Sequence, residues 1–133
     1  MNITQKHKYG LSAMVVLARF AKQGPVQLRV VSEQAKVPHA FLEQLILDLK
    51  RVGLVKSTRG AKGGYQLALS PAKITLNTIF SAIDPLECVV QDTDPVGFIW
   101  SDFNATVHDC FNVSLQSVLD SIVKKERVLT YSI

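Results

Sequence analysis

Two short stretches of the chain carry side chains that suit the edges of DNA bases. In the first, Gln44 can bond to both major-groove groups of adenine, and Glu43 can accept a hydrogen bond from cytosine N4. In the second, Arg59 and Lys62 lie in a glycine-rich loop, from which cations can enter a minor groove. The pattern predicts contacts to double-stranded DNA, with the remaining cations on phosphates. The candidate DNA-binding residues are His39, Glu43, Gln44, Lys50, Arg51, Arg59, Gly60 and Lys62.

Helical spacing of apolar residues places the first stretch on a third helix. The spacing predicts helices over residues 8–22 and 28–35, and a short turn then leads into the third helix. Pro38 suits the start of that helix, and Gly53 suits the position just past its end. One face of the helix is expected to pack against the core, with the polar candidates on the remainder. The expected packed face consists of Phe41, Leu42, Leu45, Leu49 and Val52.

A β-hairpin is expected directly after the third helix. Two β-like runs, residues 54–58 and 65–69, flank a loop whose glycines permit positive φ angles. Three helices followed by a hairpin is the order of a winged helix-turn-helix. A helix of about 10–12 Å diameter fits a major groove of about 12 Å width. The predicted fold class is therefore mainly α with a small β-hairpin wing.

The rest of the chain is predicted to form an acidic loop and further helices. A fourth helix is expected over residues 76–83, and the aperiodic segment 84–95 is expected to be a loop. Apolar residues then recur at spacings of 4, 3, 4 and 3, which is typical of a packed helix pair. We expect this helix to pack partly on the first helix and mainly on a second copy of the chain. A final helix should run from a cap at Ser114 to Val123. The expected dimer interface is Val96, Trp100, Phe103, Val107 and Cys110.

Charge is distributed unevenly along the chain. Residues 1–83 contain 12 Lys/Arg and three acids, a balance of +9, whereas residues 84–133 contain three Lys/Arg and eight acids, a balance of −5. A basic region beside an acidic one favours a polyanionic partner on one side of the molecule. Two alternatives stay open: an uneven solvated surface, and a winged-helix interaction module that has lost DNA binding.

Composition argues against several other classes of protein. The longest apolar run, residues 13–18, is far shorter than the roughly 20 residues of a membrane span, so no membrane partner is expected. Two cysteines make no disulfide framework, and the first residues lack the layout of a secretory signal, so a cytoplasmic protein is expected. Phosphate-loop, His-Glu-x-x-His and Cys-x-x-Cys motifs are absent from the sequence, so we predict no enzyme and no catalytic residues.

Several segments of the basic region resemble a known family. They are Thr-Gln-Lys-His-Lys-Tyr from Thr4, Gly-Pro-Val from Gly24, Phe-Leu-Glu-Gln-Leu from Phe41, Gly-Leu-Val-Lys-Ser from Gly53, and Arg-Gly with Gly-Gly-Tyr from Arg59. Over residues 1–83, and more weakly over 96–133, the chain is similar to the winged-helix repressors that include the iron–sulfur cluster regulator, the nitric-oxide-sensing repressor and the cysteine-metabolism repressor (IscR, NsrR, CymR).

That resemblance implies which residues read the operator. It implies that Glu43, Gln44 and Arg59 contact bases, that Gly60 forms the wing tip and that the long C-terminal helix forms the dimer interface. The small polar residue that the family often has one turn before Glu43 is Ala40 here. The wing's usual proline and glycine are Ala61 and Lys62. These departures put the operator sequence in question rather than DNA binding itself.

The sensor region departs further from the family. Cluster-bearing relatives carry three closely spaced cysteines after the fourth helix plus a fourth ligand, whereas this loop has only Cys88. A cluster needs about four protein ligands, mostly thiolates. Cys110 occupies a seam position where a buried structural cysteine is expected, and His7 and His108 are the possible imidazole ligands. We predict no cofactor and no metal site; the alternatives are a two-cysteine iron–sulfur cluster and a redox thiol at Cys88.

These observations predict a homodimeric repressor of transcription built from three segments. Residues 1–83 form the DNA-binding winged helix-turn-helix, residues 84–95 form the acidic loop at the relatives' sensor position, and residues 96–133 form the dimerisation helix and a C-terminal helix. The operator, the regulated genes and the effector do not follow from the sequence.

Overall fold

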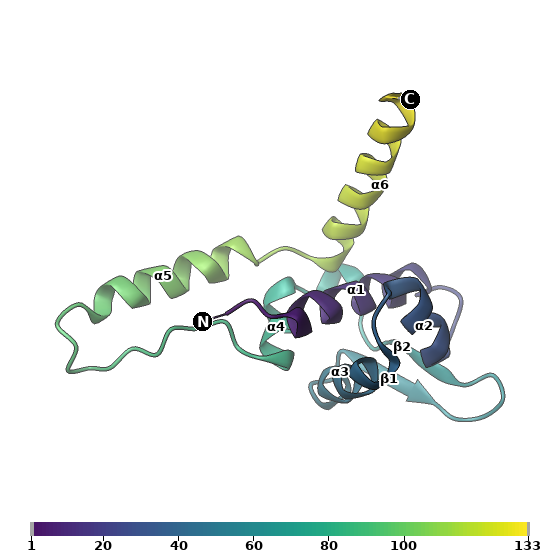
Figure 1. Ribbon diagram of the computed structural model, residues 1–133, viewed down its shortest axis with the longest axis horizontal. Helices are drawn as coiled ribbons and strands as arrows, with labels where there is room; N and C mark the ends of the chain where they lie inside the picture. Colours follow the sequence, from purple (N-terminus) through teal and green to yellow (C-terminus); the bar gives the residue numbers. More distant parts are fainter. Residues whose placement is uncertain (1, 133) are drawn as a thin grey trace.

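Helices dominate the computed structural model, which describes residues 2–132. The first four helices and a two-stranded antiparallel hairpin form one body, from which α5 and α6 extend in different directions (Figure 1). This arrangement confirms the predicted fold class. The elements are α1 (Gln5–Arg19), α2 (Leu28–Ala35), α3 (His39–Arg51), β1 (Val55–Thr58), β2 (Gly64–Leu67), the 3-10 turn η1 (Pro71–Lys73), α4 (Leu76–Ile83), α5 (Gly97–Cys110) and α6 (Leu115–Ser132).

The core lies between α1 and α3, and it differs in part from the predicted one. Phe41 and Val52, both expected on the packed face of α3, are 40% and 51% exposed, whereas Ile46 is 1% exposed. The reason is helical phase: positions 42, 45, 46 and 49 form one stripe, and Phe41 lies about 100° away from Leu42. Val52 follows the last helical residue. The ring of Phe41 instead meets the ring of Tyr9 edge-on, with the centroids 5.4 Å apart.

Helix α1 begins at Gln5, three residues before the predicted start, because Thr4 and His7 form a capping box. The backbone N–H of Thr4 donates to Nδ1 of His7 at 3.0 Å, and Nε2 of the same ring lies 2.7 Å from the carbonyl oxygen of Asp84. Since a carbonyl only accepts, Nε2 carries the hydrogen and the ring is the neutral Nε2–H tautomer. Both ring nitrogens are thus hydrogen-bonded, and neither is available to a metal ion in this conformation.

The hairpin is fixed to the start of α2 as well as to α3. Its strands are β1 and β2, slightly offset from the predicted runs, with Val55 opposite Leu67 and Thr58 opposite Gly64. Val26 and Tyr65 exchange two backbone hydrogen bonds of 2.8 Å each. Gly64 has φ +155°, and a Cβ there would collide with the carbonyl of Val26. Glycine at this position therefore permits the close approach that anchors the wing.

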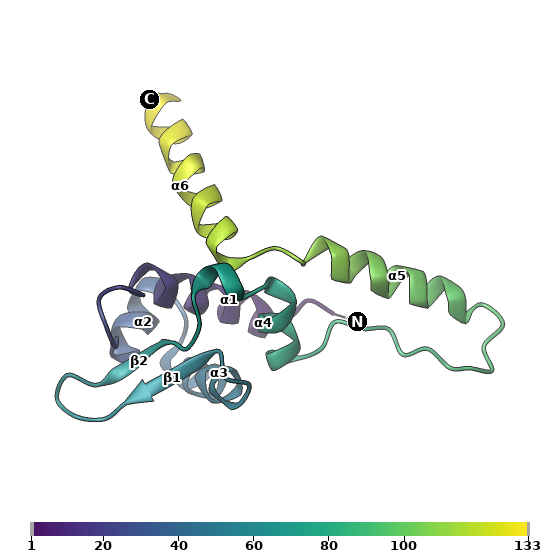
Figure 2. The ribbon, with the colours of Figure 1, turned by 180° about the vertical axis from the view of Figure 1, so that it is seen from behind.

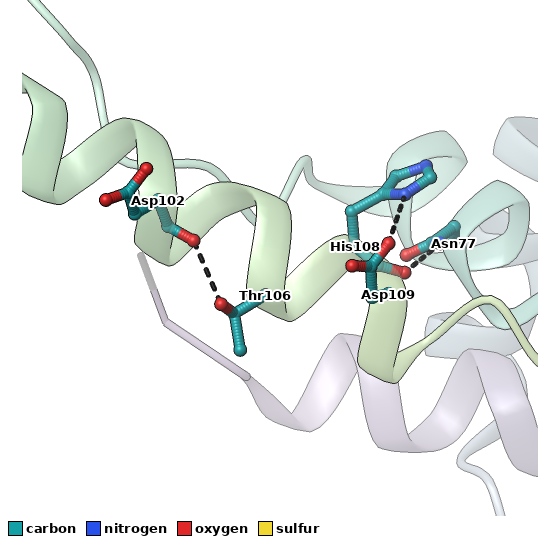
Figure 3. Close-up of polar contacts among 5 residues, drawn as sticks. All are labelled: Asn77, Asp102, Thr106, His108 and Asp109. Atoms are coloured by element: carbon teal, nitrogen blue, oxygen red, sulfur yellow. Dashed lines mark hydrogen bonds and ion pairs between the residues drawn. The ribbon is translucent and has the colours of Figure 1, made fainter.

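Helix α5 stands off the body in both views (Figures 1 and 2). Residues 84–96 contain no helix or strand, in agreement with the predicted loop. Helix α4 has its predicted range. It holds the C-terminal end of α5, because Nδ2 of Asn77 donates to the carbonyl oxygen of His108 at 2.7 Å (Figure 3). One turn earlier on α5, Oδ1 of Asn104 accepts from the N–H of Cys88 at 2.8 Å, and Nδ2 donates to the carbonyl of Cys88 at 2.9 Å. The loop is therefore attached to α5.

Helix α6, not α5, packs along α1, so the expected contact between α5 and the first helix is wrong. Backbone hydrogen bonds join residues 74–76 to residues 113–115 and carry Leu115 into the core, where it is fully buried. Ser114 caps α6 as predicted, because its Oγ accepts from the N–H of Ser117 at 3.0 Å. The helix continues nine residues beyond the predicted end at Val123, through good helix formers such as Lys124 and Glu126. Within residues 2–132, no helix combines the length and apolar character needed to cross a membrane.

Candidate nucleic-acid interface

The outward face of α3 carries the first group of predicted DNA contacts. Leu42, Leu45 and Leu49 are almost completely buried and hold the opposite face of the helix against the core. The remaining side chains must then point away from the body, because an α-helix turns by about 100° per residue. The structure places all five predicted α3 contacts on this exposed surface: His39, Glu43, Gln44, Lys50 and Arg51.

These polar side chains are already paired with neighbours one turn away. Nε2 of His39 lies 3.4 Å from Oε1 of Glu43. The amide Nε2 of Gln44 donates to Oδ1 of Asp48 at 3.3 Å, and Nη1 of Arg51 lies 3.6 Å from the same oxygen. Exposed pairs at these spacings stabilise a helix by only about 0.2–0.5 kcal/mol each. Contacts to bases and phosphates can therefore replace them at little cost.

Leu47 occupies the middle of the same outward face and was missing from the predicted contacts. It is 55% exposed, between Glu43 one turn earlier and Arg51 one turn later. A large apolar side chain at an outward helical position is the signal that could have found it. Next to Glu43 and Arg51 it gives the face an apolar centre, which suits contact with the methyl group of thymine.

The hairpin brings the second group of predicted contacts beside α3. Arg59, Gly60 and Lys62 are exposed at its turn, where Gly60 has φ +112° and accepts a 2.9 Å backbone bond from Gly63. The Nζ of Lys50, a predicted phosphate contact, donates to Oγ of Ser57 on β1 at 2.8 Å. Lys50 thus connects α3 to the hairpin. The two groups of predicted contacts therefore lie on adjacent elements of the fold.

Neither cysteine takes part in a disulfide or in a candidate metal site among residues 2–132. Cys88 is half-buried and Cys110 is exposed, and both are free thiols. The burial expected for Cys110 is therefore wrong within one protomer, since α5 stands off the body. The ring of His108 faces the Asp109 carboxylate, with Nδ1 4.0 Å from Oδ1 (Figure 3). Among residues 2–132, His, Cys, Asp and Glu side chains nowhere gather in a group of three that could hold a metal ion. This donor set does not fit an iron–sulfur cluster within a single chain.

The predicted dimer seam lies on α5, away from the body. Val96, Trp100 and Phe103 are 45%, 41% and 42% exposed, and Val107 is half-buried. Ile99, which the seam pattern omitted, is 45% exposed and lies close to the same stripe. Large apolar side chains in this number are unusual on a helix that faces only water.

Comparison with known proteins finds one family across nearly the whole chain. The profile of the Rrf2 family, described as iron-dependent transcriptional regulators, matches residues 3–124. The chain is 42% identical over 84 residues to the HTH-type transcriptional regulator IscR of Aliivibrio salmonicida, a match that covers 63% of this chain and about half, 50%, of that protein.

Solved structures agree over a longer stretch. The structure of CymR, the global cysteine regulator of B. subtilis, superimposes with a TM-score of 0.80 at 30% identity, covering 91% of this chain and 98% of that one. The T. potens IscR structure gives a TM-score of 0.78 at 32% identity, covering 92% of this chain and 88% of that one. The likeness to these two structures thus includes α5 and α6 as well as the winged region.

Proposed function

Because the chain belongs to the Rrf2 family of iron-dependent transcriptional regulators, we propose that it is a sequence-specific DNA-binding repressor that acts as a homodimer. The observation that carries the proposal is the outward face of α3, which presents Glu43, Gln44 and Arg51 beside the exposed Arg59 of the wing. The helix enters a major groove, and the wing reaches the adjacent minor groove. A repressor of this kind works in the cytoplasm, where bacterial DNA lies.

Each part of the surface has a separate task in this proposal. Glu43 and Gln44 contact base edges, while Lys50 and Arg51 contact phosphates, which fix the position of the helix without reading sequence. Arg59 and Lys62 enter the minor groove, where the negative potential favours cationic side chains. His39 lies in the first turn of α3, within reach of a base or a phosphate. Gly60 lets the wing backbone approach the DNA closely.

The dimer forms through α5. Two copies of this helix cover the stripe of Val96, Trp100, Phe103, Val107 and Cys110, most of which is exposed in one protomer. A two-fold axis through this contact sets two α3 helices at a fixed separation. The operator is therefore a near-palindrome whose half-sites lie a multiple of about 10 bp apart.

Iron has no part in the DNA-binding steps proposed for this chain. The description of the family implies iron, but the single cysteine of the 84–96 loop and the occupied nitrogens of His7 leave too few ligands for a cluster. We infer a regulator without a cluster. Iron content and the absorbance spectrum of protein purified without oxygen test this inference, and a stoichiometric cluster with visible absorbance contradicts it.

A mobility-shift titration of genomic fragments tests the function. At low salt the protein should retain many fragments, and at physiological salt it should retain a small set with a common palindrome, because salt weakens the phosphate contacts shared by all DNA. An interaction module that has lost DNA binding gives no retention at physiological salt. The Arg59→Ala variant is the control that separates binding by this surface from binding elsewhere.

A further inference from the structure

Leu47 lies at the centre of the outward face of α3, where it is 55% exposed. The fully buried Leu42 marks the direction of the core, and at about 100° per residue Leu47 lies about 140° around the helix from it. Phe41 is also exposed, but it lies about 120° around the helix from Leu47, and its ring meets that of Tyr9. On the outward face of this described helix, Leu47 is thus one large apolar side chain among polar ones.

The polar side chains around Leu47 leave it open to solvent. Positions three and four residues apart are neighbours on the surface of a helix, and four of those around Leu47 hold polar side chains. Each of the four contacts a further polar side chain: Glu43 with His39, Gln44 with Asp48, Arg51 with Asp48, and Lys50 with Ser57. More than half of the surface of Leu47 therefore remains for a ligand to cover.

An isolated leucine suits a small apolar group rather than a protein partner. A stable protein interface buries about 800 Å² on each partner, far more than one leucine offers. The cations Lys50 and Arg51 on the same helix, and Arg59 on the wing, favour a polyanion. DNA offers a small apolar group in its major groove, the methyl group on C5 of thymine. The base 5-methylcytosine carries the same methyl group on the same ring atom.

We propose that Leu47 is a specificity-determining residue that contacts the methyl group on C5 of a pyrimidine in the operator. The proposal rests on the proposed function, because it requires α3 to lie in a major groove. Thymine and 5-methylcytosine both cover Leu47, whereas unmethylated cytosine leaves its exposed surface open. Methylation of an operator cytosine at this position therefore strengthens binding, so the protein responds to the methylation state of its DNA.

The test begins with selection of binding duplexes from a random library, by the unaltered protein and by Leu47→Ala. The position at which only the unaltered protein prefers thymine is the one that Leu47 reads. Deoxyuridine then replaces thymine at that position in one half-site, which removes the methyl group and keeps every hydrogen-bonding group of the base. The dissociation constant should rise about fourfold, which is the effect of exposing one buried apolar carbon.

A second pair of duplexes carries cytosine or 5-methylcytosine at the same position. These two duplexes differ only in the methyl group, so the ratio of their affinities does not depend on the other base contacts. The methylated duplex should bind about fourfold more tightly in fluorescence anisotropy at physiological salt. The first pair tests thymine as the source of the methyl group, and the second tests methylated cytosine.

Two variants and one control assign the effect to Leu47. Leu47→Ala should bind the two members of each pair equally, whereas Leu47→Met, which keeps a large apolar side chain, should retain both ratios. Alanine and methionine are good helix formers, so neither variant should disturb α3. The matched control is Leu129→Ala, which alters a 65% exposed leucine on α6, a helix that extends away from α3 (Figure 1). It should retain both ratios.

The outcomes separate this role of Leu47 from the proposed function. If the unaltered protein enriches no duplex, the proposed function fails. If it enriches a duplex in which deoxyuridine can replace every thymine without loss of affinity, the role of Leu47 is refuted and the proposed function stands. Equal binding of cytosine and 5-methylcytosine refutes that role too, as do identical selections by the unaltered protein and Leu47→Ala. A Leu47→Ala variant that keeps both ratios contradicts it as well.

Discussion

Truncating Phe103 on α5 should separate the dimer without harming the fold. Phe103 is 42% exposed in the protomer, so roughly 80 Å² of its surface remains for a partner to cover, since a phenylalanine buries about 200 Å² when fully enclosed. At about 25 cal/mol per Å², that contact contributes about 2 kcal/mol. Two-fold symmetry places the side chain in the interface twice, which gives about 4 kcal/mol per dimer. Phe103→Ala should thus raise the dimer dissociation constant about 1000-fold.

Phe98 on the same helix provides a matched control. It is the same residue type, it is 65% exposed, and it lies about 140° around the helix from Phe103, away from the seam. Sedimentation equilibrium over a concentration series should show the dimer for the unaltered protein and for Phe98→Ala. Phe103→Ala should be a monomer at micromolar concentration and should lose operator affinity. If both variants weaken the dimer equally, the predicted seam is refuted. If the unaltered protein has the mass of a single chain, the seam and the palindromic operator are both refuted.

Three further predictions concern the DNA surface and the core. Arg59→Ala should weaken operator binding by about 1–3 kcal/mol in fluorescence anisotropy at physiological salt, whereas Lys124→Ala on α6 should leave it unchanged. If Arg59→Ala binds the operator as tightly as the unaltered protein, Arg59 is not part of the DNA interface. Glu43→Ala should keep or raise affinity for random duplexes while relaxing the selected sequence, because it removes a carboxylate that phosphates repel. An equal loss of affinity for selected and random duplexes would instead show that Glu43 has a structural role. His7→Ala should lower the free energy of unfolding by about 2–4 kcal/mol in urea, through a cavity and two lost hydrogen bonds, whereas His108→Ala, exposed on α5, should change it little.

Local sequence signals predict the helices of the winged region well, because residues such as Pro38 and Gly53 mark where a helix begins or ends. Helix α4 has its predicted range, residues 76–83, and Thr75 caps it by accepting from the N–H of Thr78 at 3.2 Å. The start of α1 was predicted three residues late, because a histidine is an unusual member of a capping box. The second hydrogen-bond partner of His7, the carbonyl of Asp84, is 77 residues away in sequence, and no local pattern reveals such a contact.

The position of α5 could not be predicted from its own pattern. The spacing of Val96, Trp100 and Phe103 indicates a helix that packs against something, but it does not say which element. Helix α6 takes the place on α1 because the backbone of residues 113–115 pairs with that of residues 74–76 and brings Leu115 into the core. This pairing depends on tertiary structure. It leaves the apolar stripe of α5 uncovered within the protomer.

For the outward face of α3, the sequence indicates which residues are exposed but not which of them contact one another. Glu43, Gln44 and Arg51 follow from residue type and helical phase. The contacts of Asp48 do not, because it is an ordinary acid one turn further on, and only the folded geometry shows that Gln44 and Arg51 share one of its oxygens. The bond of Lys50 to Ser57 does not follow from the sequence either, because it requires the hairpin to fold back beside α3.

Helix α4 lies between the proposed dimer contact on α5 and the proposed DNA contact on α3. It packs against both α1 and α3. Asn77 joins it to the end of α5, and His7 joins the residue after its last turn to the start of α1. In the proposed dimer, the separation of the two α3 helices therefore depends on the angle between α4 and α5. The 84–96 loop connects the same two helices and is bonded to α5 through Asn104. In that dimer, a change in the conformation of this loop would therefore alter the separation of the two α3 helices without any contact to α3.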